Sequence, residues 1–150
     1  MQLASSYEAA GDFEQARQLY ENVIARDPSA DIAANNLASL LSEQFESPEN
    51  LQRALTLASR FRDSQQPYFA DTFGWINYKL GNYQDARPAL ERAASSDDAI
   101  ALFHYHLGRL YVAMEMPEKA RSSFETAQVM ANDQNDNDLI GKISEQLNQI

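Results

Sequence analysis

The chain has 150 residues, of which 44% are hydrophobic and 23% charged, and its formal net charge is −10. This composition is that of a folded protein and excludes wholesale disorder, while the negative charge argues against nucleic acid or an anionic membrane surface as partner. The absence of cysteine excludes disulfides, thiolate metal sites and cysteine nucleophiles. No apolar run reaches the ~18 residues of a membrane span, so we expect no direct membrane insertion. No targeting peptide is apparent, which leaves the compartment open between cytoplasm and periplasm.

The residue pattern predicts an all-α fold. Glycine and proline are sparse, and long stretches rich in Ala, Leu, Glu, Gln and Arg favour helix. In chain order, the predicted helices cover residues 2–10, 13–25, 31–44, 48–62, 67–80, 83–95, 100–113, 117–131 and 137–149. Gly11 and Gly81 are expected to end two of these helices in a left-handed conformation, and Asp12 and Asn82 are expected to cap the helices that follow.

A repeat of 34 residues organises the sequence. Gly74 and Gly108 are 34 residues apart, and so are Ala86 and Ala120. The first segment shows the same residue pattern around Ala16. Each repeat is expected to be a pair of antiparallel helices, because small residues let two helices approach closely while larger neighbours fill the space beside them. We therefore expect Gly108 to face Ala120 across one helix pair.

The two ends and the second repeat depart from the pattern. The second repeat has about four extra residues within 44–50, where Ser47 and Pro48 provide a cap and a first-turn proline for the delayed helix. We interpret this as a surface insertion, and a functional insert is the alternative. Met1 falls at about the fifth position of its repeat, so the first helix lacks its opening turn, as in a shortened first unit or a segment of a longer array. The apolar stripe within 137–149 predicts a helix that caps the last pair.

The repeat resembles the tetratricopeptide (TPR) repeat, with L-G-x2-Y at Leu107 to Tyr111 and an alanine twelve residues after the glycine. The resemblance covers about residues 1–131. It implies a right-handed α-solenoid in a single TPR domain over 1–150. The helix-turn-helix units are expected at about 1–30, 31–66, 67–100 and 101–131, with the capping helix at about 137–149. The string Asp71-Thr72-Phe73-Gly74-Trp75 more narrowly resembles the D-T-L-G-W repeats of bacterial TPR proteins, including the TPR lipoproteins associated with exopolysaccharide export and PEP-CTERM protein sorting.

No catalytic or metal-binding motif is present. The sequence has no Gly-rich phosphate loop, no G-x-S-x-G elbow and no H-E-x-x-H. His104 and His106 would point about 200° apart on a helix, so they cannot share a metal, and we expect packing or surface roles for them. The acidic stretch 133–138 lacks the glycine and glutamate of an EF-hand loop. We predict no enzyme activity, no cofactor and no metal.

The TPR resemblance implies that the first helix of each unit lines a concave groove. The outward positions of units two to four are Ile32, Asn35, Ser39, Ser42 and Glu43, then Tyr68, Asp71, Trp75, Tyr78 and Lys79, then Leu102, Tyr105, Arg109, Val112 and Ala113. Tyr, Trp and Arg dominate binding hot spots. We select as partner-binding residues Asn35, Ser39, Tyr68, Asp71, Trp75, Tyr78, Tyr105 and Arg109. The pattern of TPR domains that grip chaperone C-termini is matched only by Asn36, which argues against that subtype.

The sequence therefore predicts a non-catalytic protein–protein interaction scaffold that holds a peptide or helix in its groove, within a bacterial assembly, export or secretion system. Self-association through the open N-terminal repeat is a further possibility. The alternative is a structural spacer of a longer TPR array, in which the aromatic residues serve packing alone. The solvent exposure of Trp75 discriminates between the two.

Overall fold

The computed structural model describes residues 1–150 and contains nine α-helices, a short 3-10 helix and no strand. The helices are α1 (Gln2–Ala9), α2 (Phe13–Arg26), α3 (Asp31–Gln44), α4 (Pro48–Ala58), η1 (Ser59–Phe61), α5 (Pro67–Lys79), α6 (Tyr83–Ala94), α7 (Ala101–Ala113), α8 (Pro117–Asp133) and α9 (Asn137–Gln149). The predicted all-α fold is confirmed, and the bounds agree to within two residues except at the end of α4, where the last turn is the 3-10 helix η1.

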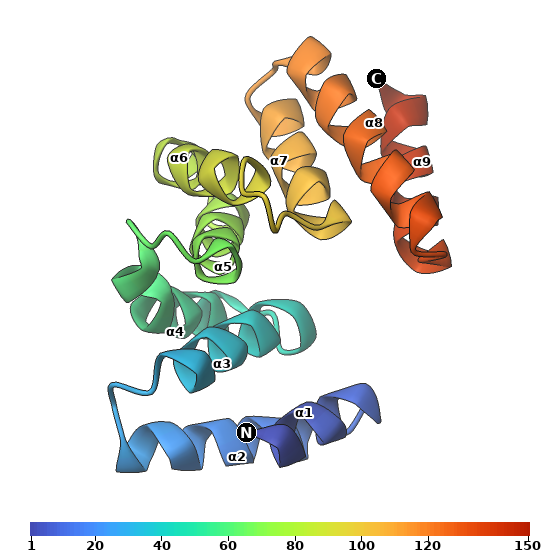
Figure 1. Cartoon of the computed structure of the whole chain (residues 1–150). Helices are drawn as coiled ribbons and strands as arrows, with labels where there is room; N and C mark the ends of the chain where they lie inside the picture. Colours follow the sequence, from blue (N-terminus) through green and yellow to red (C-terminus); the bar gives the residue numbers. More distant parts are fainter. The chain divides into compact units, whose positions relative to one another are not determined.

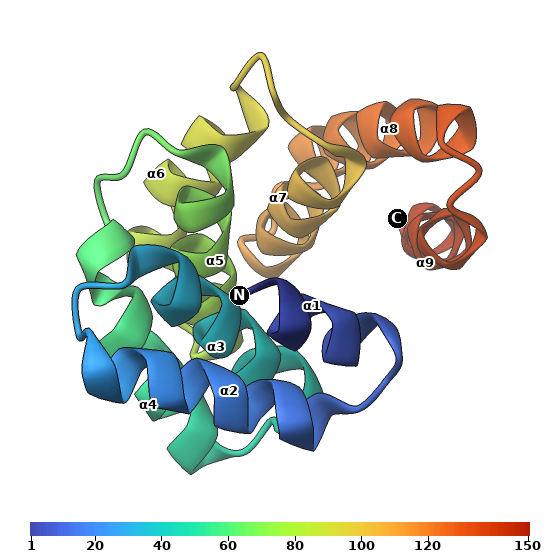
Figure 2. The same cartoon turned by 60° about the horizontal axis from the view of Figure 1, so that its bottom comes forward.

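The contacts between residues divide the chain into two compact units, Met1–Arg62 and Asp63–Ile150. In the first unit α1, α2, α3 and α4 pack in succession, and in the second α5, α6, α7, α8 and α9 do the same (Figures 1 and 2). In the second unit α5 also contacts α7, so the first helices of two successive repeats touch. The second unit begins four residues before the predicted start of the third repeat. That residues 1–150 form a single domain stays a prediction.

Glycines in the first helix of two repeats permit the close packing of each pair. A Cβ atom on Gly74 would lie 2.6 Å from Cγ of Leu90, and one on Gly108 would lie 2.5 Å from Cε1 of Phe124. The predicted close approach is confirmed, but the nearest neighbour of Gly108 is the Phe124 ring and not Ala120. Helical side chains lean toward the N-terminus of their helix, so Phe124 reaches back over the glycine from one turn beyond Ala120.

The turns inside the repeats follow the predicted glycines but not the predicted side-chain caps. Gly11 and Gly81 have φ of +80° and +81°, which is the left-handed conformation that glycine adopts without strain. Asn82 precedes α6, yet its side chain caps no backbone N–H. Instead its amide donates to Oδ1 of Asn77, 3.1 Å away, and so satisfies a buried polar group of α5. Asp12 likewise makes no side-chain cap.

The insertion and the ends match the prediction more closely. Ser47 accepts a hydrogen bond from the backbone N–H of Asn50, and Pro48 begins α4. Helix α1 has 8 residues, whereas α3, α5 and α7 have 13 or 14. Helix α9 packs on α8, and its Leu139 and Ile143 join the apolar core of the last repeat. The capping helix expected from the sequence is therefore present.

Candidate partner-binding face on α5 and α7

Six of the eight predicted partner-binding residues lie in the second unit, on α5 and α7. These six are Tyr68, Asp71, Trp75 and Tyr78 on α5 and Tyr105 and Arg109 on α7. Because α5 and α7 contact each other, their side chains meet across one boundary between repeats. Asn35 and Ser39 lie on α3 of the first unit and are described separately below. We refer to the surface formed by the six residues and their exposed neighbours Leu102 and Val112 as the α5–α7 face.

A buried hydrogen bond joins α5 to α7. Nδ1 of His106 lies 2.9 Å from both carboxylate oxygens of Asp71, and both side chains are about nine-tenths buried. An ionised carboxylate only accepts hydrogen bonds, so Nδ1–H of His106 is the donor. Sequence reasoning gave His106 no specific role. The signal that could have found it is positional, because the fifth position of one TPR unit and the sixth of the next lie on facing sides of adjacent helices.

Trp75 lies in a stack of three rings. Its ring centroid is 3.9 Å from that of His106 and 4.7 Å from that of Tyr78, with interplanar angles of 13° and 11°. Only 8% of the residue is exposed. The expectation that Trp75 stands exposed on the groove wall is therefore wrong, because the imidazole from the next repeat and the ring of Tyr78 both stack on the indole. Its contribution to binding stays a prediction.

Arg109 is held by two tyrosines. Its Nη1 donates to the hydroxyl of Tyr105 at 2.9 Å, and Cζ lies 5.9 Å and 5.8 Å from the ring centroids of Tyr78 and Tyr105. Burial disfavours the charge of the half-buried guanidinium, but the contacts with Tyr105 and Tyr78 outweigh this and raise the pKa of Arg109 above its ordinary value. The guanidinium forms no ion pair within the chain. It is a fixed positive charge on this face.

Apolar side chains remain exposed around these groups. Tyr68 is 51% exposed and packs edge-on against Phe103, with ring centroids 5.1 Å apart. Leu102 and Val112 of α7 are also exposed, as is Ile32 of α3. Seven large hydrophobic residues of the chain are exposed, and these four are among them. All four occupy positions that the repeat register assigns to the groove.

On α3, Asn35 is buried and Ser39 is exposed. Nδ2 of Asn35 donates to Oδ1 of Asn36 at 3.2 Å, while Oδ1 of Asn35 is buried and accepts no hydrogen bond. Leaving a buried acceptor without a donor costs about 1–3 kcal/mol. Because this oxygen is itself enclosed, a contact between Asn35 and a partner stays a prediction.

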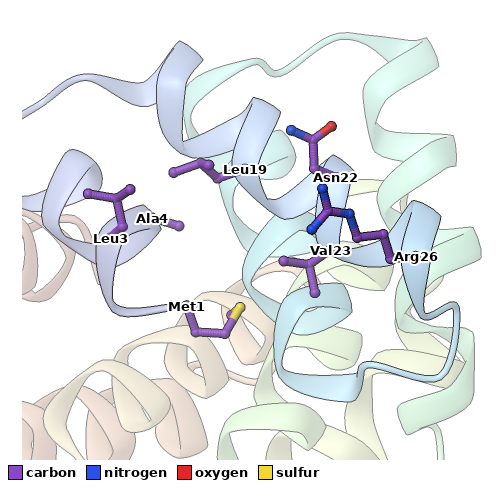
Figure 3. A pocket seen from close by; sticks show the side chains of 7 residues that line it. All are labelled: Met1, Leu3, Ala4, Leu19, Asn22, Val23 and Arg26. Atoms are coloured by element: carbon purple, nitrogen blue, oxygen red, sulfur yellow. The ribbon is translucent and has the colours of Figure 1, made fainter.

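A separate hollow of about 260 Å³ lies between α1 and α2. Figure 3 shows Met1, Leu3 and Ala4 from α1 and its start beside Leu19 and Val23 from α2, with Asn22 and Arg26 also on α2. Met1 and Leu3 are both exposed, so the hollow has an apolar edge within the first unit.

The fold and the face define a helical repeat protein. No three His, Cys, Asp or Glu side chains are grouped so that they could hold a metal ion. None of the helices combines the length and hydropathy needed to cross a membrane.

The profile of the tetratricopeptide repeat family matches residues 1–67 and 72–137. The chain therefore belongs to the tetratricopeptide repeat family, and the resemblance seen in its sequence is confirmed. No curated protein matches the sequence.

Solved structures show the same fold. A TPR protein of Thermus thermophilus, TTC0263, superimposes with a TM-score of 0.75 at 21% identity, over 97% of this chain and 78% of that one. MamA (residues 41 to the end) from Desulfovibrio magneticus RS-1 superimposes with a TM-score of 0.65 at 17% identity, over 99% of this chain and 89% of that one. YrrB is described as a TPR protein with an unusual peptide-binding site. It superimposes with a TM-score of 0.67 at 18% identity, over 95% of this chain and 71% of that one. At these identities the likeness establishes the fold.

Proposed function

We propose that this TPR chain is a non-catalytic protein–protein interaction scaffold, and that the α5–α7 face binds an extended peptide or a helix. The observation that carries the proposal is the exposure of Tyr68, Leu102 and Val112 on the helices that TPR proteins use for their concave binding surfaces. Exposed apolar side chains grouped around polar anchors are typical of interaction sites. The fold that the chain shares with YrrB supports the same reading.

The exposed Ile32 favours partner contacts on α3 as well. A spacer segment has no need of such an exposed apolar side chain, because ordinary packing would cover it. The buried Trp75 gives the opposite indication, since it serves the contact between two repeats. We therefore assign Trp75 to supporting the face, and assign partner contact to its exposed neighbours.

Selection from a random peptide library displayed on phage tests the proposal. We expect peptides to be enriched on the wild-type chain, and Leu102→Asp to weaken their binding at least about tenfold, which corresponds to about 1.4 kcal/mol. Val129→Asp is the matched control, because Val129 is exposed on α8 outside the face. If no peptide is enriched, the spacer alternative replaces the scaffold. If peptides are enriched but both variants bind them as the wild type does, the binding surface is not the α5–α7 face.

The cellular context that we propose is a bacterial assembly, export or secretion system. It rests on the likeness of Asp71–Trp75 to the D-T-L-G-W repeats of bacterial TPR proteins. Photo-crosslinking in the native cell, through a reactive residue introduced at Leu102, is expected to recover components of such a system. Recovery of unrelated metabolic enzymes alone would contradict this context and leave the scaffold role in place.

We also propose self-association through the N-terminal repeat. The hollow between α1 and α2, with exposed Met1 and Leu3 at its edge, gives a second copy an apolar surface to cover. Sedimentation velocity over a range of concentrations should show a dimer that Leu3→Glu abolishes and Val129→Glu does not. A monomer at every concentration would contradict self-association without affecting the α5–α7 face.

A further inference from the structure

We infer that the partner segment presents the side-chain carboxylate of an Asp or Glu to Arg109, which Tyr78 and Tyr105 hold ready to receive it. The inference rests on the proposed peptide-binding function and specifies the chemistry of the partner. It differs from the chaperone-tail clamp of other TPR domains, whose residue pattern this chain does not carry.

The guanidinium of Arg109 is held in a fixed position. Arginine normally loses considerable side-chain freedom when it binds a ligand. Here the hydrogen bond to Tyr105 and the two ring contacts already restrict Arg109. The bond to Tyr105 engages one of the five N–H donors of the guanidinium, and the half-buried side chain remains accessible. The other N–H donors of the guanidinium suit the two oxygens of a carboxylate.

The positive charge of Arg109 is not compensated by a carboxylate of the chain. The chain has 22 acidic residues against 12 Lys and Arg, yet none of the carboxylates pairs with Arg109. Arg87 on the neighbouring α6, by contrast, binds Glu91 at 2.7 Å. The one acidic group on the α5–α7 face, Asp71, is engaged by His106. The positive charge at the centre of the face is therefore left for a partner of opposite charge.

The groups on either side of Arg109 favour a side-chain carboxylate over that of a chain terminus. Arg109 lies between two exposed apolar groups of α7, with Leu102 two turns before it and Val112 one turn after it. A partner that covers both must continue on either side of the guanidinium. The carboxylate that reaches Arg109 is then an internal Asp or Glu flanked by apolar residues.

The test is a peptide selection with two random libraries, one displayed between constant segments and one with a free C-terminus. We expect the internal library to yield peptides enriched in Asp or Glu between apolar residues on the wild-type chain. The same selection on Arg109→Leu should lose the acidic preference. Arg121→Leu is the matched control, because Arg121 is an exposed arginine on α8 and its replacement changes the net charge equally.

A second measurement does not depend on how the variant folds. Replacing the acidic residue of an enriched peptide by its amide, Glu→Gln or Asp→Asn, should weaken binding to the wild-type chain at least about tenfold. It should change binding to Arg109→Leu by less than about twofold.

Each outcome decides between the two proposals. Enriched peptides without acidic residues, or an acidic preference that survives in Arg109→Leu, would overturn the carboxylate assignment and leave the scaffold function standing. An acidic preference seen only as a free C-terminal carboxylate would overturn the assignment to a side chain. If neither library yields a peptide, the proposed function fails and this inference fails with it.

Discussion

The indole of Trp75 lies flat against the imidazole of His106, with ring centroids 3.9 Å apart and an angle of 13° between the planes. The two residues come from α5 and α7, which belong to successive repeats. Asp71, also on α5, orients the same imidazole through its Nδ1 atom. A tryptophan at a groove position is thus buried by the neighbouring repeat.

Trp75→Ala is expected to destabilise the fold by about 3–5 kcal/mol, the range for truncating a large buried aromatic side chain. The measurement is the free energy of unfolding from urea denaturation. Tyr68→Ala is the control, since Tyr68 is half exposed and its loss should have a much smaller effect. A Trp75→Ala chain as stable as the wild type but defective in binding would instead make the indole a direct contact.

Removing one partner of the Asp71–His106 pair is expected to cost more than removing both. His106→Leu leaves the Asp71 carboxylate buried without its hydrogen-bond donor, which costs about 3–5 kcal/mol. The double variant Asp71→Leu/His106→Leu avoids the uncompensated charge. A double-mutant cycle in urea should therefore give a coupling energy at least as large as the cost of His106→Leu alone, about 3–5 kcal/mol. Additive single effects would mean that the two groups do not depend on each other.

Gly108→Ala is expected to destabilise the last repeat by about 1–3 kcal/mol through overpacking. The added Cβ would lie 2.5 Å from the Phe124 ring, which is itself fully buried and has no room to withdraw. Gly141→Ala is the matched control, because nothing lies within 4 Å of its Cβ position in α9. The control should gain up to about 1 kcal/mol from helix propensity. Equal melting temperatures for the two variants would show that the close packing at Gly108 is wrong.

Stability should fall at alkaline pH through Tyr111. Its hydroxyl donates to Oε1 of Glu91 at 2.7 Å, and burial together with Glu91 raises the pKa of Tyr111 to about 12. The unfolded chain releases this proton near pH 10. The folded state therefore binds more protons between these values, so its stabilisation is complete below about pH 10 and is lost as the pH rises toward about 12.

In the Tyr111→Phe variant, the loss of stability at alkaline pH should be smaller. Its free energy of unfolding at neutral pH should be about 1 kcal/mol lower than that of the wild type. Urea unfolding at a series of pH values from about 9 to 12 measures both effects. Tyr20 provides an internal reference, because burial and Glu8 raise its pKa to about 12 as well. The part of the alkaline loss of stability that comes from Tyr20 should persist in the Tyr111→Phe variant. An unchanged pH profile would contradict the assignment to Tyr111.

The helices and their pairing could be predicted from the sequence because their causes are local. Gly11 and Gly81 end helices by their own conformational freedom, and Pro48 begins one because it needs no N–H partner in the first turn. The 34-residue spacing of Gly74 and Gly108 follows from one structural unit repeated along the chain. Of the apolar positions that the register placed outward, Tyr68 and Leu102 are exposed, whereas Trp75 and Tyr105 are buried.

The tertiary structure decided the contacts between repeats. The burial of Trp75, the pairing of Asp71 with His106 and the enclosure of Arg109 by two tyrosines all depend on how closely α7 lies against α5. A repeat pattern states which positions face the next helix, but not the side-chain rotamers or the hydrogen bonds formed there. The sequence by itself thus determined a TPR fold with an aromatic face, because helix periodicity and turn chemistry act over a few residues. Which groups of that face are covered and which still await a partner was decided by packing between residues some 35 positions apart.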